Sequence, residues 1–459
     1  MTQTPSGKMN LPPTPAPATV AVPPAKMRRI GMASFVGTLV EFYDFSIYGT
    51  AAALVFPKVF FPALGPSAAI VASFAVFGVA FVARPFGSIL FGHFGDRLGR
   101  KRTLIATMMI MGLATVLVGV MPTTDQIGAA APILIVLLRI MQGLAAGGEW
   151  AGAVLFTAEN APKAKRGVWS MLPSLGSATA TTVANATFFI TSLTMSTETF
   201  VTWGWRVPFI ASLVLVAVGM WVRLSVDETA VFKKQLSRSS ASRVPLVEAF
   251  KRQPRSILLA TGTAIILFPF SYIGGAYLAS YGTGTLKLDT TFVLGVGMLG
   301  GVALFLGIAL TGALSDRFGR RRMIMIAMAC AIVWSLVLFP IVDSKSLLAF
   351  GAAVVLSWFI SGVVNGPIGA FLSELFPTRY RYTATGFCYA MGSVIGGAIP
   401  PLVAAAVIPA SGGFTFGLML AGLCVVSLVC ISRLAETKNY DLDRDGNLGR
   451  SEVASVAVN

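Results

Sequence analysis

A series of apolar stretches recurs along nearly the whole chain and constrains its fold more than any other feature. A helix of about 20 apolar residues crosses the hydrocarbon core of a bilayer. Only 12% of the 459 residues are charged, against roughly a quarter in an average soluble domain. The pattern predicts an all-α membrane protein with twelve spans, at residues 30–56, 67–90, 104–121, 132–156, 168–193, 207–222, 256–281, 291–314, 323–341, 347–372, 383–407 and 413–432.

The position of the basic residues predicts the orientation in the membrane. If the amino terminus is cytoplasmic, 29 of the 35 Lys and Arg residues fall in inside segments, four in outside loops, and two within spans. This asymmetry follows the positive-inside rule. It predicts a multi-pass protein of the cell (inner) membrane with both termini cytoplasmic. The net charge of +16 therefore reflects topology, and no nucleic-acid partner is expected.

A long polar stretch after the sixth span predicts the domain organisation. The first 25 residues contain seven prolines and no apolar core, which is typical of a disordered tail and not of a signal peptide. The predicted parts are a disordered cytoplasmic tail (1–28), a six-helix bundle (29–223), a cytoplasmic linker (224–255), a second six-helix bundle (256–433) and a cytoplasmic tail (434–459).

Two motifs recur across this division and indicate an internal duplication. The first is G-x-x-x-D-R-x-G-R-[RK]-R, at 92–102 after the second span and at 312–322 after the eighth. The second is an acid followed seven residues later by an arginine, at 159–166 after the fourth span and at 374–381 after the tenth.

The duplicated loop motif resembles that of the major facilitator superfamily. Within that superfamily, three segments resemble the metabolite:proton symporter family: E-F-Y-D-F at 41–45, R-I-M-Q-G at 139–143 running on to G-G-E-W at 147–150, and W-G-W-R at 203–206. The resemblance implies two pseudo-symmetric six-helix bundles that open to one side of the membrane at a time. The chain is accordingly expected to be a transporter and not an enzyme.

The resemblance also implies a gate at the cytoplasmic ends of the helices. There, charged residues of the loop motifs would hold the two halves together and separate when the halves move. The alternative is that they are solvated turn charges that follow the positive-inside rule. The expected gate residues are Asp96, Arg97, Arg100, Asp316, Arg317 and Arg320, with Glu159, Arg166, Glu374 and Arg381 as facing partners.

Five charged residues lie inside predicted spans, where a charge is costly and normally faces a cavity or a partner. Asp44 and Arg139 are the predicted proton-coupling pair, with Glu41 and Glu149 as further titrating candidates. A change in burial or in the distance to an arginine would load or release a proton. The alternative is a structural buried salt bridge. For the fifth residue, Arg84, the sequence leaves snorkelling or helix packing open.

Polar and aromatic side chains of the spans are candidates for the substrate cavity, although aromatic residues at this density also face lipid or pack helices. The carboxyl-terminal half departs from the family: Ala264 to Leu267 and Ile368 stand where many relatives have polar residues. The predicted cavity residues are Tyr43, Gln142, Tyr272, Asn365 and Tyr389.

The carboxyl-terminal tail contains a sequence that fits a calcium-binding loop. Asp441, Asp443, Asp445 and Glu452 have the spacing of EF-hand ligands. Only seven residues follow Glu452 and there is no second loop, so no metal site is predicted. No nucleophile–base or cofactor motif appears either.

The function predicted from the sequence is import of a small polar metabolite, an organic acid or a zwitterion, by proton symport. The alternatives are proton-coupled sugar uptake, drug/proton export and an uncoupled facilitator. The expected partners are a small-molecule substrate, protons and the lipid bilayer. The chain is expected to act as a monomer, without a cofactor, and to be energised by the proton gradient.

Overall fold

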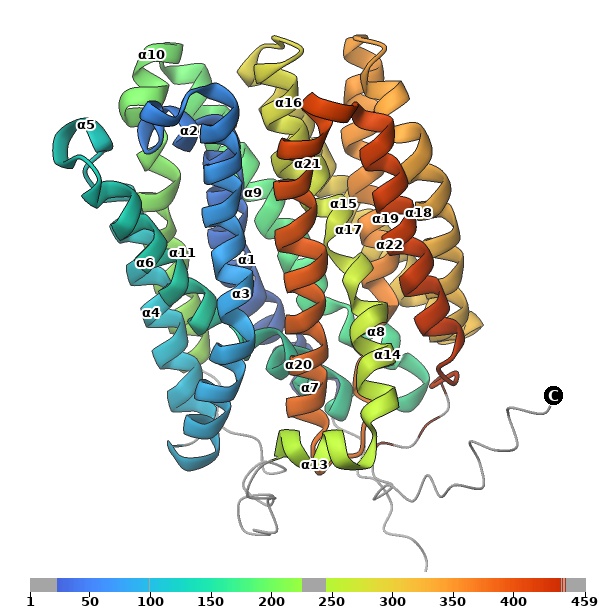
Figure 1. Ribbon diagram of the computed structural model, residues 1–459. Coiled ribbons are helices and arrows are strands. Elements are labelled where there is room, and N and C mark those ends of the chain that lie inside the picture. The colour runs from blue at the N-terminus through green and yellow to red at the C-terminus, as the bar shows by residue number, and fades with distance from the viewer. Residues whose placement is uncertain (1–22, 99, 225–244, 439, 441, 443–459) are drawn as a thin grey trace, which may run out of the picture.

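The computed structural model describes residues 23–98, 100–224, 245–438, 440 and 442; for 92–98, 100–102, 104 and 223 it describes the backbone alone. This described part is helical and contains no strand. Long helices run side by side between two ends of the molecule (Figure 1). We call the end where α13 (Pro245–Arg252) lies the lower side, and the opposite end, where α2 (Phe56–Val59) and α16 (Leu278–Gly284) lie, the upper side.

The first half of the chain forms six long helices or helix pairs. Short helices join them: η1 (Pro62–Leu64), α5 (Thr124–Ile127), η2 (Lys163–Lys165), α8 (Arg166–Ser170), α10 (Thr197–Thr199) and η3 (Phe200–Gly204). The long elements are α1 (Pro24–Leu54), α3 (Pro66–Leu98), α4 (Arg100–Val120), α6 (Ala130–Ala146) continued by α7 (Glu149–Asn160), α9 (Leu172–Thr194) and α11 (Arg206–Leu224).

The second half repeats this arrangement, and two of its spans are interrupted. The first interrupted span runs through α14 (Pro254–Ala264), η4 (Ile265–Leu267), α15 (Pro269–Tyr272), η5 (Ile273–Tyr277) and α16; the second runs through α20 (Arg381–Ser393), η6 (Val394–Ala398) and α21 (Ile399–Ser411). The others are α17 (Thr290–Phe318), α18 (Arg320–Val342), α19 (Leu347–Leu375) and α22 (Gly413–Ser432).

Each of the twelve predicted spans coincides with a helix or a collinear group of helices. In the described residues, nine helices are long and apolar enough to cross a membrane, or ten if the bent pair Thr197–Gly204 and Arg206–Val222 is one span. Two helices fall short of that criterion. The apolar part of α4 is limited to Ile105–Val120, and α9 is rich in serine and threonine.

The same helix contacts recur in both halves, which makes the halves pseudo-symmetric. The second span packs on the fourth (α3 on α6, α17 on α19), and the third on the sixth (α4 on α11, α18 on α22). The two halves meet along α9 and α17, and along α3 with α20 and α21. This is the arrangement of two six-helix bundles that the sequence predicted.

Glycine allows the closest of these helix approaches. A Cβ at Gly143 would overlap the carbonyl oxygen of Ala80, and one at Gly147 that of Arg84. In the second half, a Cβ at Gly362 or Gly366 would overlap atoms of α17 in the same way. Small residues at such crossings let backbones touch, so α3 and α6 bring their inward-facing side chains into one cluster.

Candidate transport site

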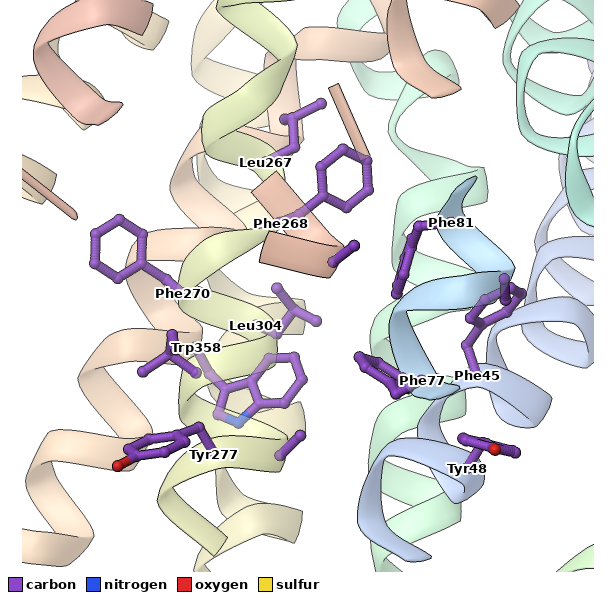
Figure 2. Packing of buried hydrophobic residues seen from close by; sticks show 14 of the residues in the cluster. Phe45, Tyr48, Phe77, Phe81, Leu267, Phe268, Phe270, Tyr277, Leu304 and Trp358 are labelled. Carbon is purple, nitrogen blue, oxygen red and sulfur yellow. The ribbon is translucent and has the colours of Figure 1, made fainter. Parts of the chain in front are cut away.

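A cavity lies between the two halves, lined by α1, α7 and α9 on one side and by η4, α15, η5, α17, α19 and α20 on the other. It contains roughly 720 Å³ of space free of protein atoms, part of it open to solvent. No charged side chain is among the described residues that line it. Figure 2 shows aromatic rings on both sides of the interface, with Phe45, Phe77 and Phe81 across from Phe268 and Trp358.

Three of the five predicted cavity residues line this cavity: Tyr272, Asn365 and Tyr389. The Asn365 amide donates to the carbonyl oxygens of Leu267 (3.1 Å) and Ser361 (2.9 Å). This side chain therefore also bridges α19 to the interrupted helix opposite it.

The structure places the other two predicted cavity residues elsewhere. The Tyr43 hydroxyl donates to the Pro208 carbonyl at 3.1 Å, inside the first bundle. The Gln142 amide is fully buried and donates to the Thr115 hydroxyl at 2.7 Å. Both side chains point from their helices into the bundle and not toward the opposite half. The direction of a side chain depends on how its helix is rotated against its neighbours, which the sequence pattern alone does not show.

The sequence analysis missed the polar side of the cavity that α9 provides. Thr181 lies 3.2 Å from the Ser46 hydroxyl, and most hydroxyls of α9 bond back to carbonyls of their own helix. The low hydropathy of this span was the available signal. The cavity-lining residues of α9 are Ser174, Ser177, Thr181 and Asn185.

A stacked aromatic pair joins the two halves at the cavity wall. The rings of Trp150, from α7, and Tyr389, from α20, are 3.7 Å apart and nearly parallel, with 8° between their planes. About two turns toward the lower end of α20, the Tyr382 hydroxyl donates to the Gly148 carbonyl at 2.7 Å. Together these contacts join α7 to α20 beside the cavity.

The three acids predicted for proton coupling lie together. Glu41, Asp44 and Glu149 line one small void beside α4 and are 3%, 1% and 4% exposed. Neither carboxylate oxygen of Asp44 has a hydrogen-bond partner among the described residues. The structure therefore brings the acids together on one side of α1, apart from the cavity.

Arg139 does not form the direct pair with Asp44 that the sequence suggested. No ion pair within 4 Å joins the two residues. Arg139 Nη1 instead donates to Gln142 Oε1 at 3.0 Å, and its guanidinium group lies 3.8 Å from the Tyr48 ring. Gln142 thus connects Arg139 to Thr115, so the contact with α4 is indirect.

Arg84 is buried and does not snorkel toward the membrane surface. Its side chain is 2% exposed, and its guanidinium carbon lies 4.0 Å from the Phe45 ring centre and 4.9 Å from that of Phe81. None of its three guanidinium nitrogens has a hydrogen-bond partner among the described residues.

The predicted gate residues form contacts between the halves on the lower side. Arg166 Nη1 lies 2.9 Å from Glu374 Oε1, and Arg381 Nη1 lies 3.2 Å from Glu159 Oε1. The Asp316 carboxylate accepts from the backbone amides of Gly167 (2.8 Å) and Val168 (3.0 Å). In this conformation the lower side is therefore closed by contacts between the two halves.

The other predicted gate residues differ in their placement. Arg320 is buried between Asp316 (2.8 Å) and Glu374 (3.4 Å). Arg317 is exposed and packs its guanidinium group on the Phe318 ring. The side chains of Asp96, Arg97 and Arg100 lie outside the described residues.

A segment after the last span was missed entirely. Residues 436–438, 440 and 442, which we call the strap, cross the closed lower side. Arg166 donates to the Tyr440 carbonyl at 3.1 Å, and Arg381 donates to the Leu442 carbonyl at 2.9 Å. The Glu436 carboxylate accepts from the backbone amides of Arg320 and Arg321, at 2.8 and 3.1 Å. Each of these bonds uses a backbone carbonyl or amide group, which leaves no mark in the sequence.

Asp441, Asp443, Asp445 and Glu452, which fit the calcium loop, lie outside the described residues. Within the described part of the chain, no group of three or more His, Cys, Asp or Glu side chains could hold a metal ion.

Two pseudo-symmetric helical halves around a central cavity define a multi-span membrane transporter. The sequence pattern of the Major Facilitator Superfamily matches residues 34–401 and 310–447. The chain therefore belongs to the major facilitator superfamily and is a transporter, not an enzyme.

Similar proteins cover most of the chain. The inner membrane metabolite transport protein YhjE of Escherichia coli K12 is 39% identical over 90% of this chain and 95% of its own length. The shikimate transporter of the same organism is 36% identical over 88% of this chain and 93% of its own length. The E. coli K12 proline/betaine transporter is 30% identical over 91% of this chain and 85% of its own length. A D-xylose-proton symporter crystal structure shares the fold, with a TM-score of 0.71, 16% identity, and coverage of 90% of this chain and 98% of that one.

Proposed function

We propose that this protein imports a small polar metabolite, an organic acid or a zwitterion, by proton symport through alternating access. The cavity supports a small polar substrate, because hydroxyl and amide groups share its wall with aromatic rings. The names of the similar proteins support the same class, since they include shikimate and proline/betaine transporters. The excess of basic residues on the lower side supports a cytoplasmic lower side.

The observation that carries the proposal is a cluster of buried acids in the core of the first bundle. Glu41, Asp44 and Glu149 are buried there, together with the guanidinium groups of Arg84 and Arg139. Several carboxylates that are ionised side by side in a low-dielectric region are costly. A proton bound by one of the acids lowers that cost.

Asp44 is the preferred carrier of that proton. An ionised carboxylate needs hydrogen-bond donors when buried, and neither of its oxygens has one among the described residues. The neutral acid therefore fits the conformation whose lower side is closed. Opening the lower side would change the surroundings of the cluster and allow the proton to leave.

Proton coupling would supply enough free energy to concentrate the substrate. One proton moving inward gains about 2.3 kcal/mol per 100 mV of membrane potential. That corresponds to a concentration ratio of nearly fifty at equal pH, by the usual conversion of free energy to an equilibrium constant.

The test is uptake by the purified full chain in proteoliposomes with an imposed inward proton gradient. The probes are shikimate, proline, glycine betaine and D-xylose. We expect an acid or zwitterion to accumulate above its outside concentration, and a protonophore to abolish the accumulation. Accumulation of D-xylose alone would favour sugar symport. Equilibration without accumulation would favour a facilitator, and gradient-driven extrusion would favour an exporter.

A further inference from the structure

Two buried arginines share contact with one aromatic ring at the edge of the cavity. The guanidinium carbons of Arg84 and Arg139 lie 4.0 and 4.7 Å from the centre of the Phe45 ring. Arg84 comes from α3 and Arg139 from α6, which the glycine contacts hold close together. Phe45 itself lines the cavity, whereas neither arginine does.

Most of the hydrogen-bond donors of these arginines are unused. All three guanidinium nitrogens of Arg84, and Nε and Nη2 of Arg139, are buried without a hydrogen-bond partner among the described residues. Arginine stays protonated in proteins, so it cannot escape this cost by losing its charge. The surrounding rings offset part of the cost of the buried charges through cation–π contacts. They do not accept hydrogen bonds from the N–H groups as a carboxylate does.

Both arginines lie against a ring of a cavity whose described wall is uncharged. Phe42 and Phe45 line the cavity. The guanidinium carbon of Arg84 lies 6.0 Å from the centre of the Phe42 ring and 4.0 Å from that of the Phe45 ring. One ring therefore separates the unused donors from the substrate space. The buried acids Glu41, Asp44 and Glu149 line a separate void beside α4 and are not among the residues that line the cavity.

We propose that Arg84 binds a carboxylate group of the transported substrate, that Arg139 supplies a second positive charge, and that the Phe45 ring moves aside to admit the carboxylate. This inference rests on the proposed function and narrows it to substrates that carry a carboxylate. A bidentate carboxylate would satisfy two of the unused nitrogens of Arg84. It would add a negative charge to the core cluster and thereby favour proton binding, which couples the two ligands.

The test compares two pairs of ligands. In one pair the carboxylate is free or esterified, and in the other it is present or absent. Thermal shifts of the purified full chain are titrated with shikimate against methyl shikimate, and with glycine betaine against choline, which lacks the carboxylate. We expect Arg84→Gln to weaken binding of the acid about 10- to 100-fold, the loss that follows removal of charge-assisted hydrogen bonds. Binding of the ester should stay unchanged.

Two further variants keep the test informative if Arg84→Gln folds poorly. Arg84→Lys retains a charge but loses the bidentate geometry, so it should show an intermediate loss for the acid alone. Phe45→Leu removes the screening ring, so it should bind the acid more tightly and the ester as before. Arg206→Gln is the matched control, because Arg206 bonds to the Met121 carbonyl at the upper end of the same bundle.

The outcomes distinguish this inference from the proposed function. If Arg84→Gln keeps the wild-type preference for the acid, or if the wild type prefers neither carboxylate, the assignment of Arg84 is overturned. Proton-driven accumulation of shikimate, proline or glycine betaine in proteoliposomes would leave the proposed function standing in that case. If the wild type accumulates no probe, the proposed function itself fails.

Discussion

Arg166 and Glu374 form an ion pair of 2.9 Å whose side chains are 5% and 0% exposed, and the pair joins the two halves of the molecule. The residues are 208 positions apart in the chain. Glu374 also accepts a hydrogen bond from Thr437 of the strap, at 2.8 Å. A single buried carboxylate thus connects the first bundle, the second bundle and the segment that follows the last span.

Replacing Arg166 with Ala should favour opening of the lower side. Breaking a buried ion pair by removing one partner costs about 3 kcal/mol or more, and this pair exists only while the halves are together on that side. The measurement is alkylation from the lower side of a cysteine introduced at Ser174, in a background without the four native cysteines. We expect alkylation to be at least tenfold faster.

The control for Arg166 is Arg252→Ala. Arg252 pairs with Glu248 at 2.9 Å, but its side chain is 61% exposed and both residues lie on α13. A surface pair contributes about 0–1 kcal/mol, so the alkylation rate should stay at the wild-type value. Equal effects of the two substitutions would argue that Arg166 does not hold the halves together.

Asp44→Asn should separate substrate movement from proton movement. The amide is neutral at every pH, so it resembles the protonated acid permanently and removes one negative charge from the buried cluster of Glu41, Asp44 and Glu149. We expect exchange of substrate across the membrane to persist while accumulation driven by a proton gradient is lost.

The pH dependence of binding gives the same test a second readout. In the wild type, substrate affinity should rise as pH falls, because the bound proton removes one negative charge from the cluster before the carboxylate of the substrate is added. In Asp44→Asn the affinity should be independent of pH. Asp343→Asn is the control, since Asp343 is an exposed acid that accepts a bond from Tyr281. Full gradient-driven accumulation by Asp44→Asn would remove this residue from the mechanism.

Gly147→Ala should destabilise the first bundle and disturb the position of Arg84. A Cβ at Gly147 would overlap the Arg84 carbonyl and lie 2.6 Å from the Ser88 amide nitrogen. Overpacking of this kind costs about 1–3 kcal/mol. The measurement is the thermal unfolding temperature of the purified protein.

Gly422→Ala provides the matched comparison. Gly422 lies on α22, and a Cβ there would meet no atom within 4 Å. Alanine is favoured over glycine in a helix interior by about 0.5–1 kcal/mol, so this variant should be slightly more stable than the wild type. A Gly147→Ala variant as stable as Gly422→Ala would mean that α3 and α6 are not in close contact.

Glu436→Gln should weaken the strap without affecting the cavity. The carboxylate bonds to two backbone amides at the first turn of α18, where a negative charge is favourable. The loss should be about 1 kcal/mol, as for other helix caps. Faster hydrogen exchange at residues 436–442, with unchanged substrate affinity, would show this. An unchanged exchange rate would contradict the role of Glu436 in holding the strap.

The sequence was sufficient to predict the membrane spans and which charged residues gather near the lower side. The helices follow the hydropathy pattern, because the cost of an unpaired polar backbone in lipid forces each apolar stretch into a helix. The family resemblance implied that Glu159, Arg166, Glu374 and Arg381 face the charges of the loop motifs. In the structure these four residues also pair with one another across the halves, Arg166 with Glu374 and Arg381 with Glu159.

The choice of cavity residues was only partly accessible from the sequence. Tyr272, Asn365 and Tyr389 line the cavity, but Tyr43 and Gln142 do not. Hydropathy shows that a residue lies in a helix, whereas the direction of its side chain depends on how that helix is rotated against its neighbours. That rotation is set by packing, as at the glycine contacts between α3 and α6.

The sequence by itself determined that this chain is a helical membrane protein built from two related halves, because span length, charge asymmetry and repeated motifs are properties of local stretches. Only the tertiary structure decided that Arg139 bonds to Gln142 and not to Asp44, that Arg84 keeps unused donors beside the Phe45 ring, and that the strap crosses the lower side. Those relationships depend on distances between side chains and backbone atoms of different helices. Such distances are fixed only when all the helices pack together.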